Sequence, residues 1–394
     1  MDGFEKEYRI MKRIGKLSYL IFCAVFIVTA FSGCGFLNGE QGFRFSSVGK
    51  DAVSVTAEEI LSYTPSRPDA VGDYLKGKLN ESELYIYNAV SYAVDNGYTD
   101  ISIPSQYGSS APESYTKAIT FYSCDSPFLE HNYTHDGTFR LSENTSAAGS
   151  TYSFTLPRNS TIFTNEKKLA YEKAKELVNN LPSALTTDKQ KTEYLYDYVC
   201  KNISYVEAVN NYRYETVPIY DALIGGKETI CDGFADTLML LLNLAGIDCF
   251  AVEGVNEKNA GHVVICAKID GQYFYLDPTN DSNIYQNGFK PGFYYALSDS
   301  QLSAYFKAEE DFSSLLPSCP VSRTKEKADV IAAGDDEASV NNAKSILLRD
   351  GAVNVSFADN VSDSDKQSFG RKLATAYGSS LLNTSANGIT GYTK

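Results

Sequence analysis

Cys231 stands at the start of a long apolar run, GGKETICDGFADTLMLLLNLAG, which covers residues 225–246. A helix that is apolar nearly all round is typical of a buried position, so the sequence predicts a buried helix over 232–245. The thiol then lies at the helix N-terminus, where unpaired N–H groups and the helix dipole favour a thiolate. Cys231 is therefore a candidate nucleophile, although a cysteine judged alone is more often a structural residue.

A nucleophilic cysteine needs a base, and the chain contains three histidines. His131 and His135 lie in the polar stretch HNYTHDG, which favours a turn or strand with surface histidines over a metal site. His262 differs from them, because it opens the β-rich run HVVICAKI and is followed by DGQYFYLDPTND. We therefore expect His262 to be the base.

The hairpin predicted after His262 supplies a third residue. Asp-Gly at 270–271, between two β-rich runs, is a strong signal for a two-residue loop. With this loop Ile265 pairs with Leu276, and His262 and Asp277 become diagonal neighbours on the opposite face, with Cβ atoms about 7–8 Å apart or somewhat less. Asp277 could then orient the imidazole and stabilise the imidazolium, unless the register slips by one residue. Read singly, His262 could be a satisfied strand-end histidine and Asp277 a turn cap.

Helices and strands around these residues can be predicted from periodicity and capping signals. A capping cluster at 186–188 precedes one helix, and Gly246 is placed to end the Cys231 helix. The predicted helices cover 82–96, 165–180, 188–202, 232–245, 339–349 and 363–377. The predicted strands cover 138–141, 152–156, 248–253, 262–269, 272–276 and 352–358.

The N-terminal segment predicts export. Three basic residues precede an apolar stretch over 17–31, which is too short for a comfortable membrane span. Ser-Gly-Cys follows at 32–34 and resembles the bacterial lipobox, in which the cysteine is lipidated. We therefore expect residues 1–33 to be a lipoprotein signal peptide and Cys34 to anchor the protein, extracytoplasmically, to the cell membrane. An ordinary signal peptide or an N-terminal anchor helix is the alternative.

Composition narrows the class of protein further. The formal net charge of −14 argues against a nucleic-acid binder. Beyond Cys34 the chain holds six widely spaced cysteines without a C-x-x-C pair, so no zinc ribbon is indicated, and we expect neither a cofactor nor a metal. Because an exported protein meets an oxidising environment, disulfides among these cysteines remain an alternative. Cys249 and Cys266 are expected to be packing residues, although a disulfide between Cys266 and Cys231 is conceivable.

Three motifs, ICDGFADTLMLLLNLAGI, GHVVI and DGQYFYLDPTND, together resemble the bacterial transglutaminase-like superfamily, in exported members of Gram-positive type. Cys231, His262 and Asp277 fall on the three positions of the family's pattern. The resemblance extends over roughly residues 60–320, of which the three-part motif is the most specific element.

The resemblance implies an α+β, papain-like fold, with the catalytic Cys helix packed on an antiparallel sheet that carries His and Asp. It also implies thiol chemistry on amides through an acyl-enzyme. Two positions depart from the family, because Val263-Val264 replaces a frequent Ala-Trp and Asn280 replaces a frequent Trp. No Trp is available to help an oxyanion hole, and Tyr220 is the candidate substitute.

The predicted organisation places a small mixed region before the catalytic domain and a small α+β region after it. The boundaries are a signal peptide over 1–33, a tether over 34–56, a mixed α/β region over 57–160, a transglutaminase-like catalytic domain over 161–320, a linker over 321–338 and a C-terminal α+β region over 339–394.

The function expected from these features is that of a surface-anchored thiol enzyme acting on peptide or glutamine amides. Hydrolysis is favoured over cross-linking, because nothing in the sequence points to water exclusion or a calcium site. The expected partners are a protein or peptide substrate, which could be associated with the cell wall, and the membrane itself. A non-catalytic cell-surface binding or structural module on the same fold is the alternative, whereas a solute-binding protein has no support in the central motif.

Overall fold

The computed structural model describes residues 42–67, 70–129, 141–146, 149–156, 165–206, 217–288, 291–324, 328–350, 352–358, 361–375, 380–385 and 388–393. The signal segment, Cys34, His131 and His135 lie outside these residues. Within them, none of the helices combines the length and the apolar character that crossing a membrane requires. The chain divides into two compact units, one formed by residues within 1–63, 80–119 and 132–161 and the other by the remainder.

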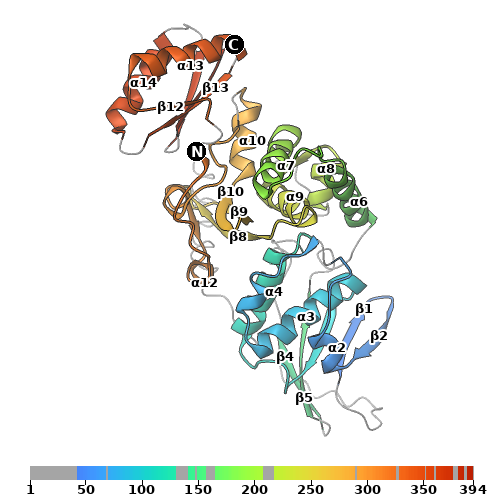
Figure 1. The fold of residues 1–394 in the computed structure, drawn as a ribbon. Helices are drawn as coiled ribbons and strands as arrows, with labels where there is room; N and C mark the ends of the chain where they lie inside the picture. Colours follow the sequence, from blue (N-terminus) through green and yellow to red (C-terminus); the bar gives the residue numbers. More distant parts are fainter. Residues whose placement is uncertain are drawn as a thin grey trace, which may run out of the picture. The chain divides into compact units, whose positions relative to one another are not determined.

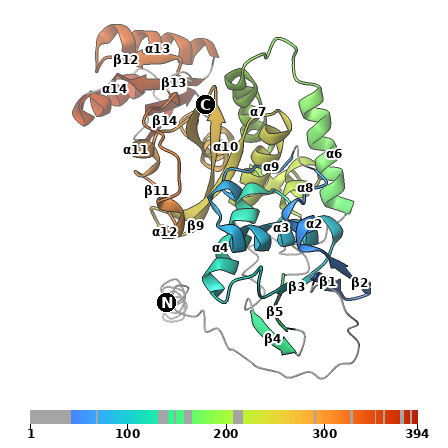
Figure 2. The same ribbon diagram turned by 60° about the horizontal axis from the view of Figure 1, so that its bottom comes forward.

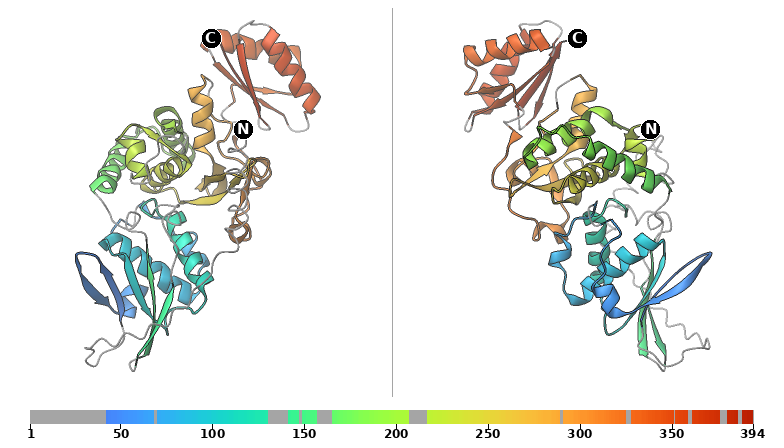
Figure 3. Two further views of the ribbon diagram at one scale, coloured as in Figure 1. Left: turned by 180° about the vertical axis from the view of Figure 1, so that it is seen from behind. Right: turned by 45° about the vertical axis from the view of Figure 1, so that its right-hand side comes forward.

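The first unit is built on an antiparallel sheet of five strands in the order β2-β1-β3-β5-β4. Its longest complete helix, α3, buries its apolar side chains in the same core. The blue helices of this unit lie beside its sheet in Figure 3. Asn80 caps α3 with a capping box, and Gly97 ends it in the left-handed conformation at φ 68°, which confirms the predicted helix. The strands are β1 (Phe43–Ser47), β2 (Lys50–Val55), β3 (Asp100–Pro104), β4 (Ser142–Ser146) and β5 (Gly149–Thr155), and the helices are α2 (Ala57–Leu61), α3 (Glu81–Asn96) and α4 (Pro112–Asp125), whose C-terminal part belongs to the second unit.

The predicted tether over 34–56 needs correction, because β1 and β2 lie within it. Phe43 and Phe45 alternate with Arg44 in β1, and both rings are fully buried. This period of two is the pattern of a strand with one face in the core. Gly49, at φ 79°, provides the turn into β2. The sheet of the first unit therefore begins well before residue 57.

The second unit surrounds the Cys231 helix, α9 (Cys231–Leu244), which is buried along its length from Asp232 to Leu242. It contacts α6 (Asn165–Asn179), α7 (Asp188–Asn202), α8 (Pro218–Leu223) and α10 (Pro278–Gln286), and these helices group around it in Figure 1. On its other side α9 contacts β8 (Cys249–Asn256) and β9 (Gly261–Ile269). The apolar run after Cys231 thus forms the centre of the core, as predicted.

The sheet beside α9 is antiparallel, in the order β10-β9-β8-β11, with β10 (Gln272–Leu276) and β11 (Phe306–Ala308) at its edges. Asp270 and Gly271 have φ values of 49° and 83°, and Ile265 pairs with Leu276, so the predicted hairpin and its register are confirmed. The α+β class, with the Cys helix packed on an antiparallel sheet, is likewise confirmed. Shorter elements are η2 (Lys76–Lys78), β6 (Ser204–Tyr205), β7 (Glu228–Thr229), α11 (Asp299–Leu302) and α12 (Glu310–Ser313).

The C-terminal part of the second unit has its own sheet and core. Strands β12 (Val330–Ala332), β13 (Ala352–Phe357), β14 (Ser380–Ser385) and β15 (Gly388–Thr393) are ordered β12-β13-β15-β14. Helices α13 (Glu337–Asp350) and α14 (Asp363–Thr375) lie beside this sheet in Figure 2 and share its core. The predicted linker over 321–338 is corrected here, because β12 lies inside it, buries Val330 and Ala332, and pairs in parallel with β13.

Candidate active site

The thiol of Cys231 lies on the first residue of α9, where the N-cap residue Ile230 supplies no side-chain hydrogen bond. The first backbone N–H groups of the helix are therefore free of a side-chain cap, and helical bonding begins with the Phe234 N–H donating to the Ile230 carbonyl. Gly233 makes this start of the helix possible. A Cβ there would come within 2.0 Å of Thr229 Oγ1, so the preceding strand could not approach the helix so closely.

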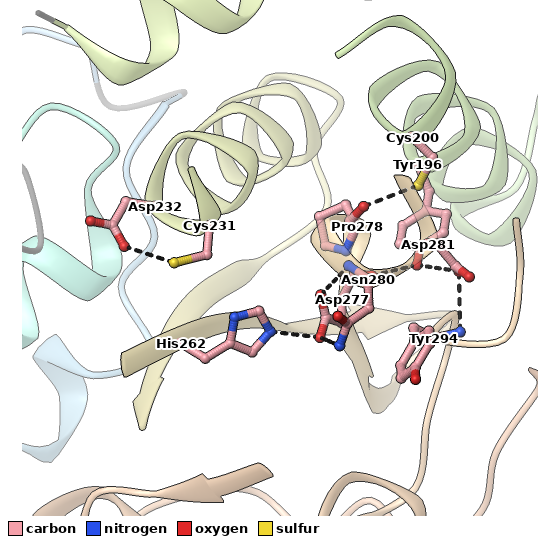
Figure 4. Close-up of polar contacts among 10 residues, drawn as sticks. All are labelled: Tyr196, Cys200, Cys231, Asp232, His262, Asp277, Pro278, Asn280, Asp281 and Tyr294. Atoms are coloured by element: carbon pink, nitrogen blue, oxygen red, sulfur yellow. Dashed lines mark hydrogen bonds and ion pairs between the residues drawn. The ribbon is translucent and has the colours of Figure 1, made fainter. Parts of the chain in front are cut away.

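His262 and Asp277 are brought together by the hairpin of β9 and β10. His262 Nε2 lies 2.7 Å from Asp277 Oδ2, and both side chains are buried. Because a carboxylate only accepts hydrogen bonds, Nε2 carries the proton and Nδ1 is left with its lone pair. Figure 4 shows Nδ1 on the side of the ring that faces Cys231. The arrangement leaves the imidazole oriented as a base toward the start of α9.

The His262 ring is also held from the side of β11. Phe306 meets it edge to face with ring centroids 6.0 Å apart. Phe306 approaches because β8 has Gly254 opposite His262, and a Cβ at Gly254 would lie 2.6 Å from the Phe306 ring and 2.3 Å from the Lys307 carbonyl oxygen. Gly254 therefore allows β11 to close over the imidazole.

Asp277 has a second task, because it is the N-cap of α10. Its Oδ1 accepts the backbone N–H of Asn280 at 3.0 Å, and its Oδ2 accepts the Asn280 side-chain amide at 2.8 Å (Figure 4). Pro278 at the first helical position is favourable for a helix start. One buried carboxylate thus ends β10, begins α10 and bonds His262.

A second buried carboxylate lies behind this pair. Asp281 accepts hydrogen bonds from the Tyr196 hydroxyl at 2.6 Å and from the backbone N–H groups of Phe293 and Tyr294 at 3.0 and 3.1 Å. Burial raises the pKa of Asp281 to about 7, although these hydrogen bonds oppose the shift. The Tyr196 hydroxyl also donates to the Asp277 backbone carbonyl at 3.0 Å, so α7 directly supports the end of the β9–β10 hairpin.

The surroundings of His262 raise its pKa. Burial lowers the pKa of His262, but the charge of Asp277, its hydrogen bond and the charge of Asp232 outweigh burial. The pKa therefore lies above its ordinary value of 6.5. The Asp277 charge also adds to burial in raising the pKa of the Tyr305 hydroxyl, which lies buried near it.

Cys231 does not show the lowered pKa expected at a helix N-terminus. Its Sγ lies 3.5 Å from Asp232 Oδ1. Burial raises the pKa of the thiol well above its ordinary value, and the Asp232 carboxylate adds to the increase, while the Asp232 backbone N–H opposes it. Within the described residues, no hydrogen bond joins Cys231 to His262. The helix terminus thus acts on the sulfur, but the neighbouring carboxylate and burial outweigh it.

Tyr220 and the remaining cysteines are the other candidates predicted from the sequence. Tyr220 lies on α8 and is partly buried, and no hydrogen bond from its side chain to Cys231 or His262 is present in the described part of the chain. Its oxyanion role stays a prediction. The six cysteines that the structure describes form no disulfide, so none joins Cys266 to Cys231. Cys249 and Cys266 are buried, as expected of packing residues. Among the same residues, no group of three or more His, Cys, Asp and Glu side chains could hold a metal.

Sequence reasoning missed Asn280, Asp281 and Phe306. The run DPTND did contain a signal, because an N-cap Asp followed three residues later by a polar side chain is typical of a capped helix start. No local signal could indicate that Tyr196 and Phe306 reach this place, because their elements are distant in sequence from the hairpin.

Residues 175–278 match the family model of the Transglutaminase-like superfamily. The chain contains a transglutaminase-like domain. The match includes all of α9 and ends just after Asp277, so it covers Cys231, His262 and Asp277 together.

Solved structures show partial similarity to this chain. They include a candidate cysteine protease from Cytophaga hutchinsonii (13% identity), a TGase (17%) and the periplasmic domain of TgpA from Pseudomonas aeruginosa (12%), each with a TM-score of 0.25. The matches cover 36%, 36% and 35% of this chain and 62%, 44% and 56% of those chains, which is less than two thirds of each. Because these values are low, nothing about activity or substrate follows from them. No curated protein matches the sequence.

Proposed function

We propose that this protein is a thiol enzyme that cleaves peptide or glutamine amides through an acyl-enzyme, with Cys231 as nucleophile, His262 as base and acid, and Asp277 as the residue that orients His262. The observation that carries the proposal is the 2.7 Å contact between His262 Nε2 and Asp277 Oδ2, which leaves Nδ1 facing the start of the Cys231 helix. A nucleophile, a base and an orienting carboxylate are the parts that acyl transfer to a thiol requires.

In the first step His262 Nδ1 takes the proton of the Cys231 thiol, and Sγ attacks the amide carbon. Rotation about the Cys231 side chain, away from Asp232, brings Sγ toward the ring. The tetrahedral oxyanion can be stabilised by backbone N–H groups at the start of α9, of which the Asp232 N–H already faces the sulfur. The carbon–nitrogen bond then breaks, and the imidazolium gives its proton to the leaving amine.

In the second step the thioester is resolved by water or by an amine. His262 removes a proton from that acceptor, which attacks the thioester carbon and restores the Cys231 thiol as the carbon–sulfur bond breaks. Cys231 is partly exposed, which gives water access to the thioester. We therefore favour hydrolysis over cross-linking. The lipobox-like sequence at Cys34 supports anchoring of the enzyme at the outer face of the cell membrane.

A non-catalytic module on the same fold is the second candidate. It is favoured by one observation, the contact of the Cys231 thiol with Asp232 in place of His262. In such a module the three residues would be structural, and the thiol would be no more reactive than the buried cysteines.

The proposal can be tested by alkylation with iodoacetamide and by activity on peptides. The rates of modification of Cys231, Cys249 and Cys266 are measured by mass spectrometry in the intact protein, before and after His262→Ala. Glutamine-containing and unmodified peptide libraries are then incubated with the protein and with Cys231→Ala, with and without an added primary amine.

We expect Cys231 to react fastest, and we expect His262→Ala to slow the amide reaction by about 100-fold or more. Release of ammonia or of a new peptide terminus identifies hydrolysis, whereas amine incorporation identifies acyl transfer. The enzyme proposal is wrong if Cys231 reacts no faster than the two buried cysteines and Cys231→Ala changes no amide reaction. That result would leave the non-catalytic module.

A further inference from the structure

We propose that Asn280 is a positioning residue of the catalytic site. Its side-chain amide fixes the Asp277 carboxylate by donating to Oδ2, the same oxygen that His262 bonds. The proposal rests on the proposed function for its catalytic consequence. Its geometry stands independently, on two hydrogen bonds that the structure places inside the site.

Asn280 donates one hydrogen bond to each oxygen of the Asp277 carboxylate. Oδ1 accepts the Asn280 backbone N–H at 3.0 Å, and Oδ2 accepts both the Asn280 Nδ2 amide at 2.8 Å and His262 Nε2 at 2.7 Å. With both oxygens held by Asn280, the carboxylate cannot rotate about its own axis without losing a bond. His262 therefore meets a fixed acceptor.

The position of Asn280 in the helix explains why its amide takes this contact. Asn280 is the third residue of α10, from which a side chain commonly reaches back to the N-cap backbone N–H. That N–H is already used here, because Asp277 N donates to the Tyr294 carbonyl at 2.9 Å. The Asn280 amide instead donates to the N-cap carboxylate, and so the capping residue becomes part of the catalytic pair.

A second donor on Oδ2 weakens the hold of this oxygen on the imidazolium. A hydrogen bond to a carboxylate stabilises its charge and reduces what is available to a neighbouring cation. The charged groups that act on His262 are Asp277 and Asp232. The titratable groups near Asp277 include Asp281 and the neutral hydroxyls of Tyr294 and Tyr305, and the Tyr305 hydroxyl also interacts directly with the Asp277 carboxylate. The Asn280 amide donates to the same oxygen as His262.

Asn280→Ala should therefore shift the titration of His262 to higher pH, by about half a unit or more, because Oδ2 keeps His262 as its side-chain donor and loses the amide. The titration is followed by the imidazole C2 proton in NMR spectra of the full chain, with the signal assigned by its loss in His262→Gln. The backbone cap survives, since it uses the Asn280 N–H. The pH dependence of Cys231 alkylation should move in the same direction.

Asn287→Ala is the matched control, because Asn287 is an exposed residue at the end of the same helix whose amide bonds only the Asn283 carbonyl, and it should leave the titration unchanged. Asn280→Asp keeps the shape of the side chain, removes the donor and adds a negative charge, so its upward shift should exceed that of Asn280→Ala. It serves also where the alanine variant does not fold.

An unchanged or lowered His262 titration in a folded Asn280 variant would overturn the proposal. This outcome is distinct from failure of the proposed function, because the titration is measured without substrate. A titration that shifts as expected in a protein without amide activity would keep the positioning role and discard the enzyme.

Discussion

The sulfur of Cys231 receives two opposite influences from one residue. The Asp232 carboxylate lies 3.5 Å from Sγ and disfavours a thiolate, whereas the Asp232 backbone N–H favours it. Burial is the larger cause of the raised thiol pKa and acts in the same direction as the carboxylate, so the thiol is kept protonated in the resting site. A proton acceptor must therefore approach before the sulfur becomes nucleophilic, which makes the reaction depend on His262.

Asp232→Asn should make Cys231 react faster with iodoacetamide at neutral pH, by about tenfold for each unit by which the thiol pKa falls. The same change should lower the pKa of His262, since Asp232 is among the groups that raise it. Alkylation rates measured between pH 6 and pH 9 by mass spectrometry check both effects.

Glu228→Gln is the control for Asp232→Asn, because it removes an exposed carboxylate three residues before Cys231. It should leave the alkylation profile as it is. Equal profiles for Asp232→Asn and the unaltered protein would show that the carboxylate does not govern the thiol.

The residues of the site differ in how far the sequence predicts them. His262 and Asp277 were paired from sequence because an Asp-Gly turn fixes the register of a hairpin, and register alone puts them on one face. The protonated state of Cys231 was not predictable, because it depends on burial and on the rotamer of Asp232. Asp281 was also missed, because its partner Tyr196 lies 85 residues away.

At the scale of elements, β11 determines how His262 is enclosed. Its first residue, Phe306, packs against the imidazole, and this contact requires Gly254 on β8. Because β11 lies so close to β8, there is no room for a side chain at position 254. The edge strand is therefore part of the candidate active site.

Gly254→Ala should displace β11 and destabilise the domain by about 1–3 kcal/mol, because the new Cβ would meet backbone atoms that cannot move aside alone. Thermal unfolding and the rate of Cys231 alkylation should both change. Gly261→Ala is the matched control on the neighbouring strand, since a Cβ there meets nothing within 4 Å. Equal unfolding temperatures for the two variants would refute the role given to Gly254.

Asp281 joins α7, α10 and the segment at 293–294 through one buried carboxylate. Its pKa of about 7 in the folded state exceeds the ordinary value of 3.8, so the folded protein binds a proton there that the unfolded chain has released. Between these two values the contribution of Asp281 to stability must fall as pH rises, by roughly 1.4 kcal/mol per unit at most.

Asp281→Asn should remove this slope. As pH rises from 4.5 to 7, the unfolding temperature of the unaltered protein should fall relative to that of Asp281→Asn. Above pH 7 the difference between the two should stay constant. Asp270→Asn, which removes an exposed carboxylate in the hairpin turn, should leave the slope unaltered. A constant difference between Asp281→Asn and the unaltered protein over this range would contradict the pKa of about 7.

Elements with strong local signals were predicted well, and short strands were not. Capping boxes and a left-handed glycine identify α3 and α7, and the helices flanking β13 agree closely with their periodicity. β12 has only three residues and is stabilised by pairing with β13, so nothing local marks it. The alternation of Phe43 and Phe45 is the only local sign of β1, and the surrounding glycines and serines favour a tether over a strand.

At the scale of the whole molecule, the export signal and the lipobox-like sequence at Cys34 motivate the proposal that the protein is held outside the cell. The net charge of −14 keeps it from anionic lipid headgroups except through an anchor. Lipidation of Cys34 with more than one acyl chain would supply that anchor.

Cys34→Ser should therefore release the protein from the membrane fraction into the medium or the soluble extract. Its mass should lack the lipid, and the rate of Cys231 alkylation should be unchanged. Cys124→Ser, which alters a buried cysteine in the described part of the chain, should leave the protein in the membrane fraction. Persistence of Cys34→Ser in the detergent phase would favour an anchor helix.

The double use of Asp277 has a consequence for how the site can be observed. The Asn280 backbone N–H donates to Oδ1 of the carboxylate whose Oδ2 bonds His262, so opening of the first turn of α10 and loss of the catalytic contact become one event. Hydrogen exchange at this single amide would then report how often the catalytic pair comes apart in the native protein. The fastest rate of exchange, reached when every opening leads to exchange, equals the rate of opening and so gives the time for which the site stays assembled between openings.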